Sequence, residues 1–118
     1  MRFILVVTAL ASALAFAQTK PATAETGVCS YYSRHHDGHI TAGGKKFSSN
    51  ALTAAHRTYP MGTKLKLTNT ANDKTVEVVV NDRGPFVKGR DISVTRRAAR
   101  QLGFIKQGIA TVRIEEVR

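Results

Sequence analysis

The chain carries two stretches in which apolar residues recur at every second position, Thr63-Lys64-Leu65-Lys66-Leu67-Thr68 and Thr75-Val76-Glu77-Val78-Val79-Val80. This period predicts two β-strands, each with one buried face. The residues between them, 69–73, are rich in Asn and Asp, which favour turns. We therefore expect a β-hairpin over residues 63–80, with the side chains at positions 65, 67, 76, 78 and 80 facing inward.

Two more elements are indicated outside the hairpin. The segment Ile109–Val117 predicts a last strand, with positions 110, 112 and 114 on its inner side. Thr95 is a good N-cap for a helix over residues 96–102, and Gly103 suits the position just past its end. Several short strands with one or two short helices favour a mainly β fold, a single small β-barrel.

Length and composition exclude several classes of protein and of binding site. A chain of 118 residues has room for one domain. Its single cysteine, Cys29, excludes an internal disulfide and a zinc site built from several thiolates. The formal charge of +10 indicates anionic partners. No ribonucleoprotein signature or recognition-helix pattern supports nucleic acid as that partner.

The N-terminal residues predict export. Met1-Arg2 is a short basic start, residues 3–17 carry no charge, and Ala15-Phe16-Ala17 fits a signal-peptidase site. We expect a signal peptide over residues 1–17, a linker over 18–26 and the barrel over 27–118, with a second cleavage site after Ala24 left open. The residues before Cys29 do not fit a lipid-modified cysteine. The expected product is a monomer in the periplasm or cell envelope, without stable membrane insertion.

Three clusters have the residue types needed for chemistry. Asp82 follows the valine-rich strand and precedes Arg83-Gly84-Pro85, so it is either a general acid on a rigid turn or a turn cap that pairs with Arg83. His56 lies between small residues and suits proton transfer, although a lone histidine is more often structural. A glycine-rich loop, residues 41–47, follows Tyr31-Tyr32, whose rings either stack on sugars or fill the core.

The sequence does not predict a metal site or a cofactor. His35, His36 and His39 are close in sequence, but adjacent side chains point apart in an extended chain, and no set of four ligands is evident.

Taken in order, six blocks resemble the rare lipoprotein A (RlpA) family of bacterial cell-wall proteins. They are residues 27–32, Thr41-Ala42-Gly43-Gly44, residues 50–58, Gly62-Thr63, Asn81-Asp82-Arg83-Gly84-Pro85-Phe86 and Gly89-Arg90. The resemblance covers about Gly27 to Val117. It implies a six-stranded double-psi β-barrel and a lytic transglycosylase that acts on peptidoglycan glycan strands, leaving 1,6-anhydro-N-acetylmuramic acid ends. It also implies cell-division proteins as partners.

The resemblance implies Asp82 and His56 as catalytic residues. We expect further side chains to contact the substrate: Tyr31, Tyr32, Thr41, Lys45, Arg57, Arg83 and Arg90. Two positions depart from the family pattern, because Lys45 stands where members usually have Glu and Ser93 where they usually have Asp. A lysine near Asp82 would favour its ionised form, which makes a poor general acid, or would bind a muramyl carboxylate instead.

Two classes of function therefore stay open. One is a transglycosylase that uses Asp82, with Asp37 as an alternative acid from the neighbouring loop. The other is a non-catalytic glycan-binding module on the same barrel. A secreted effector or inhibitor shaped like plant expansins is a third hypothesis.

Overall fold

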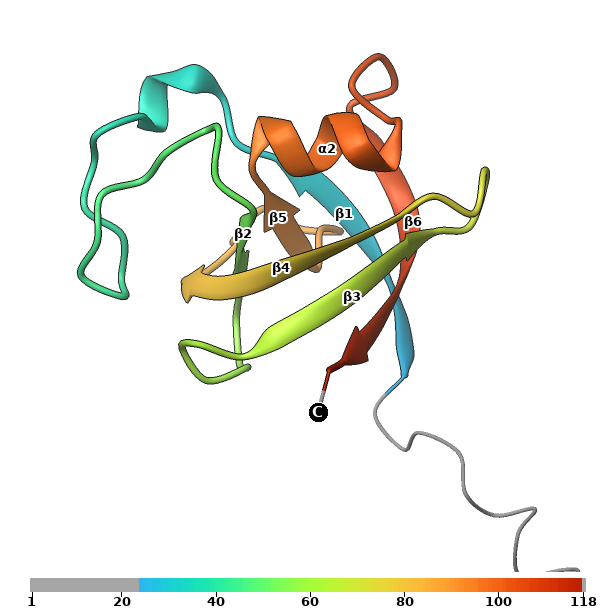
Figure 1. Cartoon of the computed structure of the whole chain (residues 1–118), viewed down its shortest axis with the longest axis horizontal. Coiled ribbons are helices and arrows are strands. Elements are labelled where there is room, and N and C mark those ends of the chain that lie inside the picture. Colours follow the sequence, from blue (N-terminus) through green and yellow to red (C-terminus); the bar gives the residue numbers. More distant parts are fainter. Residues whose placement is uncertain (1–23, 118) are drawn as a thin grey trace, which may run out of the picture.

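The structure is a computed structural model that describes residues 24–117. Within this range the chain forms a closed six-stranded barrel with the strand order β1-β5-β2-β4-β3-β6 (Figure 1). The strands are β1 (Glu25–Tyr31), β2 (Thr53–His56), β3 (Lys64–Asn69), β4 (Thr75–Asp82), β5 (Ile92–Val94) and β6 (Ile109–Glu116). The prediction of a mainly β, six-stranded barrel is confirmed.

The expected signal peptide, residues 1–17, lies outside the described residues, as do residues 18–23 of the expected linker. The barrel begins at Glu25, two residues before the expected domain start. Glu25 pairs with Ile114 and Thr26 with Arg113 on β6, so the ladder already includes them.

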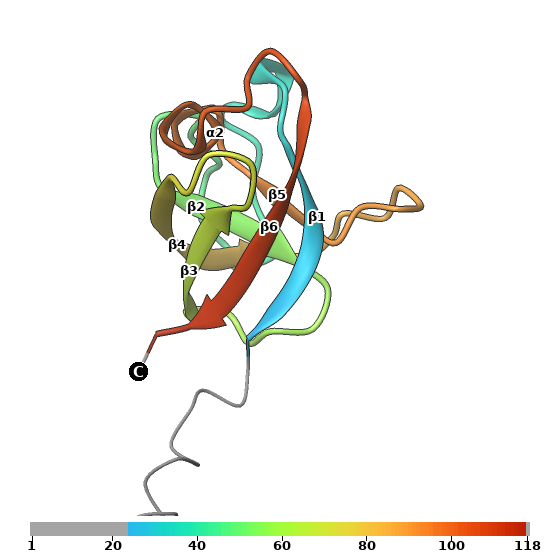
Figure 2. The same ribbon diagram turned by 90° about the vertical axis from the view of Figure 1, so that its right-hand side faces the viewer.

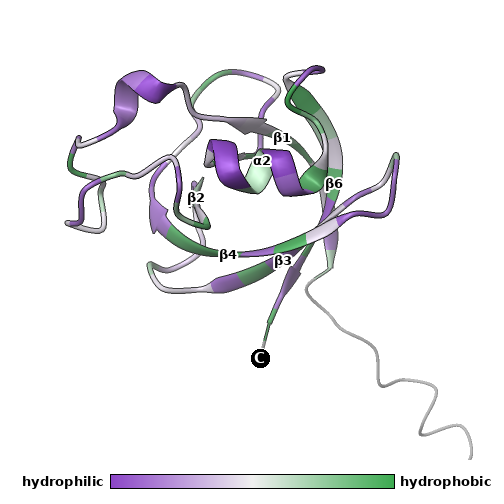
Figure 3. Cartoon of the chain, turned by 45° about the horizontal axis from the view of Figure 1, so that its top comes forward, coloured by the Kyte–Doolittle hydropathy of each residue, from purple (hydrophilic) through white to green (hydrophobic). Residues whose placement is uncertain are grey.

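The predicted hairpin is β3 and β4, which pair antiparallel with Leu65 opposite Val78 and Leu67 opposite Val76. Figure 3 shows the alternation of hydrophobic and hydrophilic residues along both strands. The apolar positions of both strands are buried in the barrel core, and Val112 and Ile114 of β6 join them. The core follows from the period of two in the sequence.

The predicted helix is α2 (Arg96–Leu102). The Thr95 side chain accepts a hydrogen bond from Ala98 N, and Gly103 ends the helix in the left-handed conformation (φ 76°). Ala98, Ala99 and Leu102 are buried against the barrel core, and Figure 3 shows α2 lying across one open end of the barrel.

Turn 69–73 is tied to the end of α2. The Asn69 and Asn72 side-chain amides both donate to Leu102 O, at 2.8 and 3.1 Å. These bonds satisfy a carbonyl that the helix end leaves unpaired.

Cys29 is fully buried inside β1, and burial raises the pKa of its thiol to about 12. The thiol is therefore an inert member of the core. Among the described residues, no helix is long and apolar enough to cross a membrane.

Candidate active site

Asp82 is the last residue of β4, and its carboxylate is held by three donors. Oδ2 accepts from the Tyr32 hydroxyl at 2.8 Å. Oδ1 accepts from Ala42 N and Arg83 N, each at 2.9 Å. Two of the three donors come from segments far away in sequence, so the fold fixes the orientation of the carboxylate.

Tyr32 follows β1 and stands beside Asp82. Its ring packs against Phe47 and His36, with centroid distances of 4.5 and 4.9 Å. Burial, the hydrogen bond to Asp82 and the charge of Asp82 all raise the pKa of Tyr32. Tyr32 therefore keeps its proton and remains a donor to the carboxylate.

The glycine-rich loop packs onto the end of β4. Gly43 N donates to Asn81 O at 2.9 Å, and a Cβ added at Gly43 would lie only 2.8 Å from that oxygen. Thr41 is buried and shapes the loop, because its N and Oγ1 both donate to Lys45 O, at 2.8 and 2.9 Å. Lys45 itself is exposed, and among the ion pairs of the described residues none joins it to Asp82.

The floor of the site is a row of paired residues that crosses four strands. The row consists of Ser30 of β1, Ser93 of β5, Ala55 of β2 and Asp82 of β4. Apart from Asp82, these side chains are small, so the outer surface of the barrel is hollowed beside the carboxylate. The cavity measures about 360 Å³.

The walls of this cavity come from the segments 31–36 and 83–90. Of the residues that line it within the described range, Asp82 is the only acidic one. Ser93, which stands where the resemblance leads us to expect Asp, lies in the same row as Asp82. Among the described residues, the cavity thus has the Asp82 carboxylate alone, whereas the family pattern would add a second carboxylate at position 93.

His56 does not meet Asp82. Since Ala55 is paired with Asp82, side-chain alternation along β2 puts His56 on the other face, toward the barrel interior, where it is paired with Ile92. It lines a separate cavity of about 400 Å³ at the end of the barrel, together with Glu25, Tyr59 and others. The two predicted catalytic side chains belong to different cavities.

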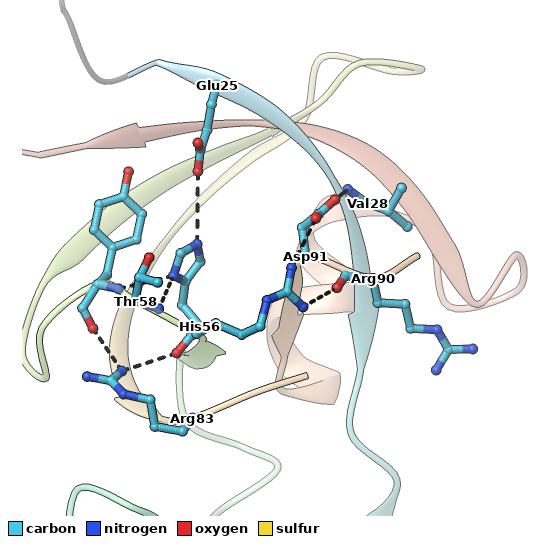
Figure 4. Close-up of polar contacts among 9 residues, drawn as sticks. Glu25, Val28, His56, Thr58, Arg83, Arg90 and Asp91 are labelled. Carbon is cyan, nitrogen blue, oxygen red and sulfur yellow. Dashed lines mark hydrogen bonds and ion pairs between the residues drawn. The ribbon is translucent and has the colours of Figure 1, made fainter. Parts of the chain in front are cut away.

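The hydrogen bonds of His56 define its tautomer (Figure 4). Nδ1 accepts from Thr58 N and Tyr59 N, both at 3.1 Å, so the ring proton is on Nε2, 3.9 Å from Glu25 Oε1. Burial lowers the pKa of His56, and it outweighs the charge of Glu25, which acts in the opposite direction; the charges of Arg57 and Arg83 add to the lowering. The imidazole is thus a neutral group that organises the turn after β2.

Two of the predicted substrate-binding arginines hold backbone segments together. Arg83 donates to His56 O at 3.1 Å and to Tyr59 O at 2.8 Å (Figure 4). Arg57 donates to Pro85 O and Arg90 O, both at 2.7 Å. Both guanidinium groups are therefore engaged in hydrogen bonds that hold the backbone.

Of the remaining predicted residues, some support the structure and Arg90 lines the Asp82 cavity. The Tyr31 hydroxyl donates to Ile105 O at 3.0 Å and its ring packs edge-on against Phe104, so most of this side chain supports the core. Arg90 is exposed and lines the Asp82 cavity. Asp37 accepts from Ser49 N and Oγ at 2.7 and 3.0 Å and does not line that cavity.

Sequence reasoning missed His36, Phe86 and Val87, which line the Asp82 cavity, and Glu25 and Asp91, which surround His56. The apolar pair Phe86-Val87 in an otherwise polar loop was the available signal. His36 belongs to a short 3-10 helix, η1 (Arg34–His36), and not to an extended chain. Within residues 24–117, no group of three His, Cys, Asp or Glu residues is placed to hold a metal ion.

Comparison with protein families gives a match to the family described as "Lytic transglycolase" over residues 24–114. Curated relatives include proteins named endolytic peptidoglycan transglycosylase RlpA. That of Neisseria meningitidis serogroup B is 47% identical over 93 residues, which cover 79% of this chain and 39% of the relative. That of Rickettsia typhi is 51% identical over 94 residues, which cover 77% and 29%. The chain therefore spans well under half the length of these relatives.

Solved structures with a similar fold are more distant in sequence. A Clavibacter michiganensis expansin, solved as a mutant in complex with cellohexaose, superposes with a TM-score of 0.65 at 21% identity, over 81% of this chain and 51% of the expansin. The Streptomyces papain inhibitor gives a TM-score of 0.66 at 20% identity, over 83% and 97%. At these identities the likeness concerns the barrel alone.

Proposed function

The chain belongs to the RlpA family of lytic transglycosylases, whose fold is the double-psi β-barrel, and on this premise we propose that it is an endolytic peptidoglycan transglycosylase. It cleaves the bond between N-acetylmuramic acid and N-acetylglucosamine and leaves 1,6-anhydro ends, in cell-wall organisation or cell separation. The observation that carries the proposal is the Asp82 carboxylate, fixed by three donors at the floor of an open cavity.

In this mechanism Asp82 serves as acid and then as base. Protonated Asp82 gives its proton to the glycosidic oxygen, and the bond from that oxygen to C1 of N-acetylmuramic acid breaks. The C6 hydroxyl oxygen then bonds to C1 and its proton returns to Asp82, so no water is consumed. One carboxylate is sufficient, whereas hydrolysis by the usual glycosidase route uses two.

The three donors around Asp82 assist the bond-breaking step. As the proton leaves, negative charge develops on Asp82, and Tyr32 Oη together with the two backbone N–H groups already points at it. Donors positioned before the reaction stabilise such charge without reorganisation.

A second candidate function is a glycan-binding module without turnover. It is favoured by the chemistry around Asp82: the cavity has no other acidic residue within residues 24–117, and Lys45 and Ser93 replace the acids of the family pattern.

Digestion of purified glycan strands separates the two functions. The protein and its Asp82→Asn variant are incubated with naked and peptide-bearing strands, and the products are read by mass spectrometry. Anhydro ends formed only by the unmodified protein support the enzyme. Binding of both proteins to the glycan without products would leave the binding module.

Export is part of the proposal, with the leader over Met1–Ala17 and the mature protein in the periplasm or cell envelope. Cleavage after Ala24 would start the mature chain at Glu25, the first residue of β1. Intact-mass measurement of the exported protein is expected to find a start at Gln18 or Glu25, and a full-length mass would contradict the proposal.

A further inference from the structure

The segment between β4 and β5 carries two neighbouring apolar side chains that the barrel does not cover. Figure 2 shows this segment projecting from the side of the molecule. Phe86 is 80% exposed and Val87 is 54% exposed. Both line the same cavity as Asp82. An exposed apolar pair beside a polar cavity is a candidate binding surface.

The loop is held in place from the barrel side. Arg57 bridges its two ends, since it donates to Pro85 O and Arg90 O, and its guanidinium also contacts Asp91 Oδ1 at 3.3 Å. Asp91 is anchored in turn, because its Oδ2 accepts from Val28 N at 2.8 Å. Figure 4 shows this chain of contacts from Asp91 to Val28.

The tip of the loop is also closed, because Arg90 N donates to Val87 O at 3.2 Å. The Phe86 ring lies near Gly84, where a Cβ would be 3.5 Å from the ring. The ring is thus presented by an anchored loop, and binding would cost little ordering entropy.

We propose that Phe86, supported by Val87, is a stacking platform for a pyranose ring of the glycan strand, next to the sugar that reacts at Asp82. This inference rests on the proposed function and adds a subsite to it. The apolar C–H face of a sugar matches an aromatic ring, and the hydroxyl edge stays in water. Arg90, exposed on the same cavity, is available to a carboxylate or hydroxyl of that sugar.

The size and position of the platform favour a sugar over a protein surface. Two side chains match one sugar ring, whereas a specific protein interface buries about 800 Å² on each partner. The platform is also continuous with the Asp82 cavity, through which a strand must pass if Asp82 is to reach its glycosidic bond.

The test measures glycan affinity in the Asp82→Asn background, where strands are not consumed. Phe86→Ala is expected to weaken binding of purified naked strands about tenfold, and Phe86→Trp to keep it. Ile40→Ala is the matched control, because Ile40 is 66% exposed but does not line the cavity. In the active protein, Phe86→Ala should raise KM with little change in kcat.

The outcomes separate the subsite from the function. If the unmodified protein cleaves or binds strands and Phe86→Ala behaves like Ile40→Ala, the subsite is refuted and the function stands. If the unmodified protein neither binds nor cleaves, both are refuted. Binding to anionic phospholipid vesicles is measured for the same variant. If Phe86→Ala loses vesicle binding while its glycan affinity is unchanged, the loop is a membrane contact and the subsite is refuted.

Discussion

Gly43→Ala is a single-methyl test of how the glycine-rich loop supports Asp82. The added Cβ would lie 2.8 Å from Asn81 O, and ordinary contact begins near 3.4 Å. Relief of this clash requires the loop and β4 to separate by about 0.6 Å at this point, which is 3.4 minus 2.8. The same movement stretches the bonds from Ala42 N to Asp82 Oδ1 and from Gly43 N to Asn81 O, both now 2.9 Å, to about 3.5 Å.

The magnitude follows from these two bonds. A hydrogen bond to a charged group contributes about 1.5–3 kcal/mol and a neutral one about 0.5–1.5 kcal/mol. We expect the free energy of unfolding to fall by about 2 kcal/mol, because the loop relaxes partly. If the bond to Asp82 acts fully in the transition state, turnover falls by about 10- to 150-fold.

Denaturant unfolding and the release of anhydro ends measure the two effects. Ala42→Ser is the matched control, since Ala42 is exposed and the change leaves its N–H in place. Unfolding and turnover of Gly43→Ala within error of Ala42→Ser would refute the idea that the loop holds Asp82.

Three other changes probe the supports of the site. Burial lowers the pKa of His56, so the unfolded chain binds more protons than the folded one. The free energy of unfolding should therefore fall as the pH drops through about 6.5 toward the lower pKa of the folded state. His56→Asn should flatten this dependence in denaturant midpoints measured at several pH values, whereas the control His39→Asn, at an exposed position, should not. Arg57→Lys loses the two-carbonyl bridge across the loop and should weaken glycan affinity as Phe86→Ala does, with thermal unfolding little changed; unaltered affinity would contradict the bridging role. Thr95→Val removes the helix cap and a 2.6 Å bond to Ala51 O, and should lower the free energy of unfolding by about 1–2 kcal/mol in chemical denaturation; no loss would contradict the capping role.

The sequence predicted the elements whose signals are local. The β3–β4 hairpin follows from alternation around an Asn/Asp turn, and α2 from a cap at Thr95 and a stop at Gly103. β1, β2 and β5 were not identified by pattern. β2 and β5 are only four and three residues long and buried on both faces. A strand covered on both sides has no alternation to detect.

The candidate site was predicted only in part, because its geometry depends on contacts between residues that are far apart in sequence. Asp82 stands out in its motif, but two of the groups that hold it, Tyr32 and Ala42, are 50 and 40 residues away in sequence. Arginines beside the motif were expected to face the substrate, yet Arg57 and Arg83 donate to backbone carbonyls. Spacing in sequence does not say which of these partners a side chain will meet.

The position of His56 illustrates how a register decides chemistry. β2 and β4 run parallel, and the irregularity between Ala54 and Ala55 makes Ala55 the partner of Asp82. A histidine one residue further along β2 therefore faces the other side of the sheet. The other side chains that line the Asp82 cavity come from Ser30, Tyr31 and Ser93 on the strands and from the segments 32–36 and 83–90. Since the segment 83–90 lies outside the barrel ladder, a change at Phe86 is expected to alter glycan binding while the barrel stays intact.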